Sequence, residues 1–75
     1  MKVYGFQISD EQLADGVGAM SGIFRLHAVQ HALVQAGVPQ GAVASRAADR
    51  LLQRERKAGR VQTNPENKRE WIGDD

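Results

Sequence analysis

The stretch LVQAGVPQGAVASRAADRLLQRERKAG, residues 33–59, contains the end of one amphipathic helix, a tight turn and a second, strongly basic helix. Gly37 follows the last apolar residue of the first pattern, where glycine commonly ends a helix, and Pro39 fixes φ for the start of the next helix. The second pattern predicts a helix over 40–58. Its apolar face is rich in alanine, which permits close packing, and consists of Ala44, Ala47, Ala48, Leu51 and Ala58, with Val43 and Leu52 at its edges.

The opposite face of the 40–58 helix is polar and basic. Side chains at i, i+4, i+7 and i+11 form a continuous ribbon there. The members of this ribbon are Arg46, Arg50, Gln53 and Lys57. Residues 45–62 carry six basic and two acidic side chains, whereas residues 1–44 carry two basic and three acidic ones. Because the positive charge is concentrated in one segment, a polyanionic partner is expected to meet the protein there.

Glu55 does not fit the pattern of the 40–58 helix, because it lies near the centre of the apolar arc. A buried carboxylate is costly unless it is paired and hydrogen-bonded. Two explanations remain open on the sequence alone. Either the apolar core has ended at this level of the helix, or Glu55 is paired with a basic group that the pattern does not identify.

The N-terminal third of the chain predicts a strand and two helices. A β-favouring run over 3–8 places Tyr4, Phe6 and Ile8 on one face of a strand. Ser9 and Gln12 stand at capping-box spacing, so a helix is expected to start at residue 10. A second helix is expected over about 25–36, after a break at residues 21–22.

After Gly59 the apolar period changes to two, which predicts a β-hairpin over 61–72 with a polar tip at 64–67. Val61 and Trp71 are expected on its inner face, closing the base of the 40–58 helix. Core packing is favoured for Trp71 over stacking on a base, because single-strand platforms need several exposed aromatic side chains. Residues 73–75 are expected to be frayed.

The length and composition of the chain limit the class of protein. A chain of 75 residues closes a single hydrophobic core, so we expect one domain over 1–75. The absence of cysteine excludes disulfides and thiolate metal sites and fits a reducing cytoplasm. No apolar run approaches the roughly 18 residues that cross a bilayer, and the start of the chain has no run of signal-peptide length. We therefore expect a cytoplasmic protein without a membrane partner.

The order of helix, tight glycine turn, basic helix, glycine and hairpin resembles the winged helix-turn-helix superfamily over residues 10–72. The resemblance is carried by the turn at 33–38, the helix at 45–52, Ala58 and Gly59 with Val61 after them, and the hairpin closed by Trp71. It implies a mainly α fold with a small β part: three helices, an N-terminal strand and a C-terminal β-hairpin wing. In that superfamily a strand between the first two helices is more usual than one ahead of them. The size and general sequence character of the chain are similar to those of small phage and mobile-element regulators.

The resemblance implies double-stranded DNA as the partner, read by the 40–58 helix in the major groove. Arginine can bind guanine bidentately, glutamine can do the same for adenine, and lysine supplies a point charge for phosphate. The candidates for base contacts are Ser45, Arg46, Asp49 and Arg50. The candidates for phosphate contacts are Gln53, Arg54 and Lys57. The candidates in the wing, for phosphate or the minor groove, are Asn64, Asn67, Lys68 and Arg69, for which plain solvent exposure is the alternative.

A homodimer is expected, because a single module of this size buries only about 600–1,000 Å² on DNA. The function implied is sequence-specific DNA binding by a transcriptional regulator or accessory factor of phage or mobile-element type. A protein-interaction module is the alternative, such as a small inhibitor that binds a host protein. The weak net charge of +1 and the acidic residues Glu55, Glu66 and Glu70 beside the basic ribbon keep this second possibility open.

Enzymatic activity, metal binding and cofactor binding are not expected. His27 and His31 stand at i, i+4 but lack a third ligand at a readable spacing. The Gly16-Val17-Gly18 segment does not connect a strand to a helix within a βαβ unit, so it is not a phosphate loop. No combination of nucleophile, base and acid, and no pair of carboxylates, has a reason to converge.

Overall fold

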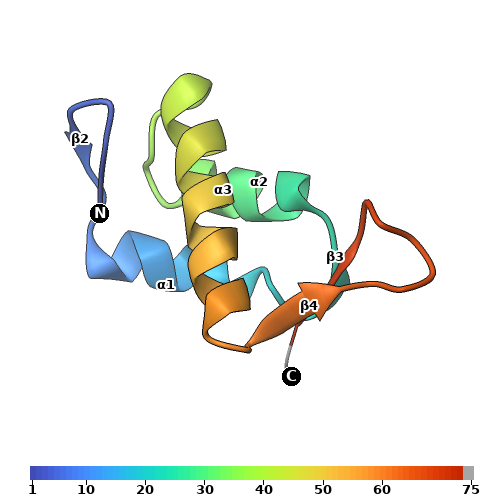
Figure 1. Ribbon diagram of the computed structural model, residues 1–75. Coiled ribbons are helices and arrows are strands. Elements are labelled where there is room, and N and C mark those ends of the chain that lie inside the picture. Colours follow the sequence, from blue (N-terminus) through green and yellow to red (C-terminus); the bar gives the residue numbers. More distant parts are fainter. Residues whose placement is uncertain (74–75) are drawn as a thin grey trace.

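The computed structural model describes residues 1–73, which form three helices and two small antiparallel sheets (Figure 1). The helices are α1 (Asp10–Gly18), α2 (Leu26–Gln35) and α3 (Ala42–Lys57). In the view of Figure 1, α3 crosses in front of α1 and α2, so one long side of α3 remains uncovered.

The hydrophobic core lies where α3 packs on the other two helices. The fully buried side chains of α3 are Ala44, Ala47, Ala48 and Leu51, and Leu52 is only 1% exposed. This confirms the predicted apolar face except at Ala58, which caps the helix and is exposed. At Gly16 a Cβ atom would lie 2.8 Å from Leu51 Cδ2 and 2.9 Å from Leu33 Cδ2, so a glycine lets α1 approach this core closely.

The starts and ends of the helices largely follow the sequence signals. The capping box of α1 is confirmed: the N–H of Gln12 donates to Ser9 Oγ (3.1 Å) and the N–H of Ser9 donates to Gln12 Oε1 (3.0 Å). The second helix ends before Gly37, which has a φ of 105°. The third helix begins later than expected, because Gly41 is its N-cap, with a φ of 97° that breaks the helical path after Pro39.

The N-terminal segment is a β-hairpin, so the prediction of a single strand over 3–8 is wrong. Strands β1 (Lys2–Val3) and β2 (Phe6–Gln7) pair through a turn formed by Tyr4 and Gly5. Both turn residues have a positive φ, 49° and 81° respectively. Because the chain reverses there, Tyr4 lies at the tip, where it is 71% exposed, while Ile8 is buried in the core.

The C-terminal hairpin is confirmed, and it belongs to a three-stranded sheet. Strands β4 (Val61–Thr63) and β5 (Trp71–Gly73) form the hairpin, and β5 also pairs with β3 (Gly22–Phe24). The sequence interpretation took residues 21–22 as a plain break and missed β3, which is only three residues long. The order of strands in the sheet is β3-β5-β4, with β5 at the centre.

The last described residue, Gly73, was expected to be frayed but belongs to β5. A Cβ atom there would clash with the backbone carbonyl of Met20, so only glycine fits against the segment that leads into β3. The other two residues of the expected frayed tail, 74 and 75, lie outside the described part of the chain.

The two sheets lie at opposite ends of the molecule, with α3 between them (Figure 1). The N-terminal hairpin lies toward the start of α3, and the β3-β5-β4 sheet lies at its end, where Gly59 leads into β4. The longest dimension of the molecule is 36 Å. The uncovered side of α3 therefore forms the middle of an elongated surface with a hairpin on either side.

Candidate nucleic-acid interface

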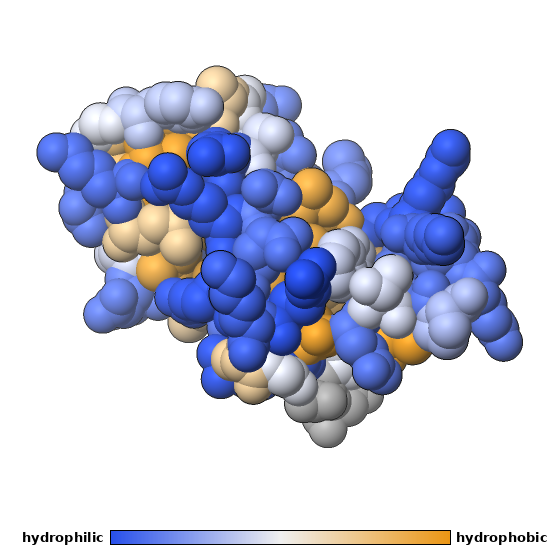
Figure 2. Space-filling model, in the orientation of Figure 1, coloured by the Kyte–Doolittle hydropathy of each residue, from blue (hydrophilic) through white to orange (hydrophobic). Residues whose placement is uncertain are grey.

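The uncovered side of α3 is hydrophilic along its length, and Figure 2 shows these side chains as a band over the middle of the molecule. The exposed members are Ser45, Arg46, Arg50, Arg54, Arg56 and Lys57. Asp49 and Gln53 are half-buried. The structure thus brings all seven helix residues predicted as DNA contacts, together with Arg56, onto the part of α3 that the other helices do not cover.

Arg46, Arg56 and Lys57 are the most available cations of the band. None of these side chains makes a hydrogen bond or ion pair with another residue in the range 1–73. A long cationic side chain without an internal partner keeps its rotamer freedom and its full charge for an external anion.

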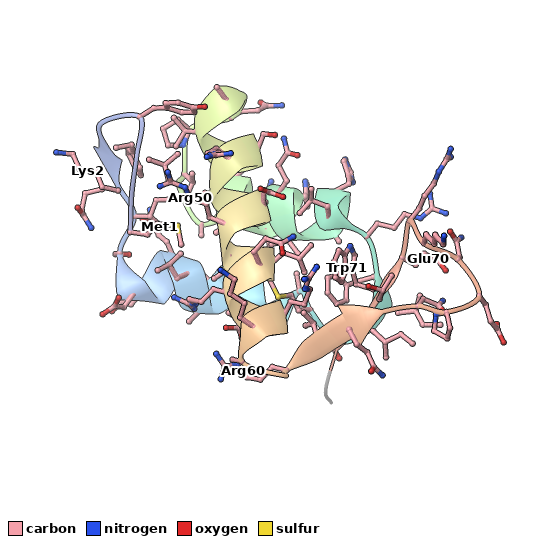
Figure 3. The ribbon with its side chains drawn as sticks, viewed as in Figure 1. Met1, Lys2, Arg50, Arg60, Glu70 and Trp71 are labelled. Atoms are coloured by element: carbon pink, nitrogen blue, oxygen red, sulfur yellow. The ribbon has the colours of Figure 1, made fainter. Side chains whose placement is uncertain are left out.

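Arg50 is held toward the N-terminal hairpin. Its Nη1 donates to the backbone carbonyl of Lys2 at 3.2 Å, across 48 residues of sequence. Figure 3 shows the side chain reaching from α3 toward Met1 and Lys2. Arg50 therefore fixes the hairpin beside α3, a role that periodicity cannot reveal, while the guanidinium group stays exposed.

Glu55 is paired, which confirms the second of the two explanations left open for it. The side chain is 3% exposed and receives a bidentate contact from Arg60, with Nε to Oε1 at 2.8 Å and Nη2 to Oε2 at 2.7 Å. Figure 3 shows Arg60 at the lower end of α3, where the chain turns into β4. Arg54 Nε also donates to Glu55 Oε2 at 3.4 Å.

The pair changes the electrostatics of this end of α3. The hydrogen bond from Arg60 lowers the pKa of Glu55 below its ordinary value of 4.5; burial opposes this, and the charges of Arg60 and Arg54 add to the lowering. Of the two arginines, Arg54 was predicted as a phosphate contact. Its charge is partly engaged by Glu55, although its side chain is 49% exposed. Arg54 is therefore less available to an external anion than the unpaired cations.

Removing the guanidinium of Arg60 is expected to make the free energy of unfolding less dependent on pH in the acidic range. A lowered folded-state pKa means that the pair stabilises the protein above about pH 4.5, and that this contribution is lost as the pH falls through the folded value. The variant Arg60→Gln should therefore unfold at a lower urea concentration than the wild type at pH 7, and the difference should shrink below pH 4.5. The matched control is Arg56→Gln, because Arg56 is exposed and its side chain contacts no partner in the described chain. A pH-independent difference would contradict this role for the pair.

Asn64 is a structural residue of the loop between β4 and β5, not an available contact. It is only 6% exposed, because its Oδ1 accepts the N–H of Glu66 (3.0 Å) and its Nδ2 donates to Glu70 Oε1 (3.3 Å). Its backbone N–H donates to the carbonyl of Glu70 at 3.0 Å. The expectation that Asn64 lies exposed at the hairpin tip is thus wrong, and its side chain is a poor candidate for a DNA contact because its polar atoms are engaged within the loop. Polar side chains that close turns carry the same sequence signature as exposed ones.

The remaining wing candidates lie at the surface. Asn67 is half-buried, and its Oδ1 accepts the N–H of Arg69 at 3.0 Å. Lys68 and Arg69 are exposed beside it. The acidic neighbour Glu70 lies 3.7 Å from Arg25 Nη2, which ties the loop to the end of β3. The loop thus presents two available cations on an internally braced frame.

A hollow of about 440 Å³ lies beside the first half of α3. The side chains around it come from the N-terminal hairpin, the start of α2 and the first two turns of α3: Tyr4, Leu26, Ala42, Ser45, Arg46 and Asp49. The structure therefore brings three of the four predicted base contacts to one concave surface. Arg50, the fourth, turns to the hairpin instead.

Trp71 and the two histidines have the surroundings expected from the sequence. Trp71 is half-buried and packs against the core, beside α3 in Figure 3. His27 and His31 are exposed on α2. Within residues 1–73 no group of three or more His, Cys, Asp or Glu side chains is arranged to hold a metal ion. The helices described here are also too short or too polar to cross a membrane.

Comparisons of the chain with family models, with curated proteins and with solved structures found no match.

Proposed function

We propose that the protein binds double-stranded DNA sequence-specifically, with α3 as the recognition helix of a winged helix. The observation that carries this proposal is the exposed basic face of α3 between two hairpins. On this face Arg46 and Lys57 have no internal partner among residues 1–73, and Arg50 keeps an exposed guanidinium.

The order of elements supports the winged-helix interpretation. After the N-terminal hairpin β1-β2, the chain runs α1, β3, α2, α3, β4, β5. The short strand β3 lies between the first two helices, which is the more usual place for a strand in that superfamily. The C-terminal hairpin would be the wing, with Lys68 and Arg69 as its phosphate contacts.

The dimensions of α3 suit the major groove. Its 16 residues give a length of about 24 Å, and a helix with side chains is about 10–12 Å wide. The major groove of B-DNA is about 12 Å wide. In this arrangement Ser45, Arg46 and Asp49 face the base edges, and Gln53 and Lys57 lie nearer the phosphates.

The biological role we propose is that of a small transcriptional regulator or accessory factor of phage or mobile-element type, working in the cytoplasm. Two copies on a two-fold symmetric site would raise affinity and specificity, with half-sites about one helical turn apart. The half-buried Asp49 on the interface makes tight binding to any phosphate backbone less favourable and so favours selective contact.

The binding constant for duplex DNA is expected to fall steeply with salt. Each neutralised phosphate contributes about −0.9 to the slope of log K against log salt concentration, so the available cations of α3 and the wing predict a slope of about −3 to −5 per protomer. Fluorescence anisotropy at several salt concentrations measures the slope. Selection of bound duplexes from a random pool would then give the half-site and its symmetry. Salt-independent binding, together with a failure to enrich any duplex, would favour the protein-interaction module instead.

A further inference from the structure

Neither core packing nor backbone conformation favours a tyrosine at position 4. Tyr4 is 71% exposed, so its ring contributes little to the core. Its φ of 49° lies in the left-handed region, which bulky residues rarely adopt. Two-residue turns of this kind favour asparagine, aspartate or glycine at both central positions, and only Gly5 satisfies that preference.

The backbone on both sides of Tyr4 is fixed. Val3 is 2% exposed and Ile8 1% exposed, so both ends of the hairpin are anchored in the core. The hydrogen bond from Arg50 to the carbonyl of Lys2 adds a direct tie to α3. The turn that carries Tyr4 is therefore held in a defined place beside the helix.

Tyr4 shares the hollow beside α3 with Ser45, Arg46 and Asp49, the three candidates for base contacts. If α3 occupies the major groove, it fills most of the width of the groove. A side chain that stands next to the base-reading residues but on a separate element must then lie at the edge of the groove, where the sugar-phosphate backbone runs.

We infer that the N-terminal hairpin is a second DNA-contacting element, in which the Tyr4 hydroxyl donates a hydrogen bond to a backbone phosphate beside the bases that Arg46 contacts. This inference rests on the proposed DNA binding. Tyrosine is among the side chains that make such contacts, which fix the register of a protein on the duplex. Lys2 is excluded from this contact, because its side chain points away from α3 (Figure 3).

The test uses Tyr4→Asn and Tyr4→Phe in DNA-binding and unfolding measurements. Asparagine tolerates a positive φ better than tyrosine, so Tyr4→Asn should be at least as stable as the wild type. Its affinity for the selected duplex should nevertheless fall about 5- to 20-fold. Tyr4→Phe, which removes only the hydroxyl, should show most of this decrease in affinity. Because the phenol is neutral, the salt slope should stay unchanged in both variants, unlike the effect of removing a cation.

The matched control is Ile23→Thr, which changes a second large hydrophobic residue that is exposed in the described chain, at 63% on β3. This variant should bind DNA like the wild type. Wild-type affinity in either Tyr4 variant overturns the inference while leaving DNA binding by α3 intact. If the wild-type protein itself binds no duplex at low salt, the proposed function fails, and the Tyr4 inference fails with it.

Discussion

Replacing Leu51 by alanine is expected to remove most of the free energy of unfolding of the protein. Leu51 is fully buried, and its Cδ2 lies in the contact between α3 and Gly16 of α1. Truncation of a buried leucine to alanine costs about 2–5 kcal/mol, because the cavity that remains collapses only partly. A domain of this size has a total stability of only about 3–5 kcal/mol.

Urea unfolding followed by circular dichroism measures this effect, with Ile23→Ala as the matched control. Both variants remove a four-carbon aliphatic side chain down to a methyl group, but Ile23 is 63% exposed and makes no core contact of comparable burial. The control should change stability by less than about 1 kcal/mol. A similar small change for Leu51→Ala would mean that α1 does not pack on α3 as described.

The variant Arg46→Glu is expected to weaken binding to the selected duplex by about 100-fold or more. A lost arginine contact to a base costs about 1–3 kcal/mol, and the new carboxylate adds repulsion from the phosphates. Arg46 is the best single position for this test, because its side chain has no partner within the described chain and its replacement breaks no internal contact. Arg50→Glu would be less clear, since it would also release the N-terminal hairpin.

The control for Arg46→Glu must change the net charge by the same amount. The double variant Ala28→Glu with Gln35→Glu does so at exposed positions of α2, outside the proposed interface. This control should weaken binding only slightly, through long-range repulsion that salt screens. Equal losses in the two variants, or no loss in Arg46→Glu, would mean that α3 is not the contact surface.

The helices could be predicted from the sequence because their signals are local. Ser9 and Gln12 lie three residues apart at the first turn of α1, and the alanine-rich face of α3 repeats within a few residues. The short strand β3 could not be predicted in the same way. It has only three residues, and it is a strand because β5, far along the chain, pairs with it.

The candidate site was predictable to a similar degree. Periodicity is enough to place Arg46, Lys57 and their neighbours on one face of α3. It does not show that Asn64 is consumed by hydrogen bonds within its loop, or that Arg50 binds the hairpin carbonyl. The pairing of Glu55 with Arg60 did have a signal, namely an unexplained acid on an apolar face followed five residues later by a cation. These two side chains meet only because the chain turns at Gly59, directly after α3.

The central position of β5 sets an order of events for folding. The three helices depend mainly on contacts between neighbouring segments, so they can form and pack early. The β3-β5-β4 sheet needs residues 71–73 to enter between two strands, one of which precedes α2. Closing so long a loop is slow compared with helix formation. We therefore expect the β3-β5-β4 sheet to be the last part of the protein to acquire its native structure, after the helix that it flanks.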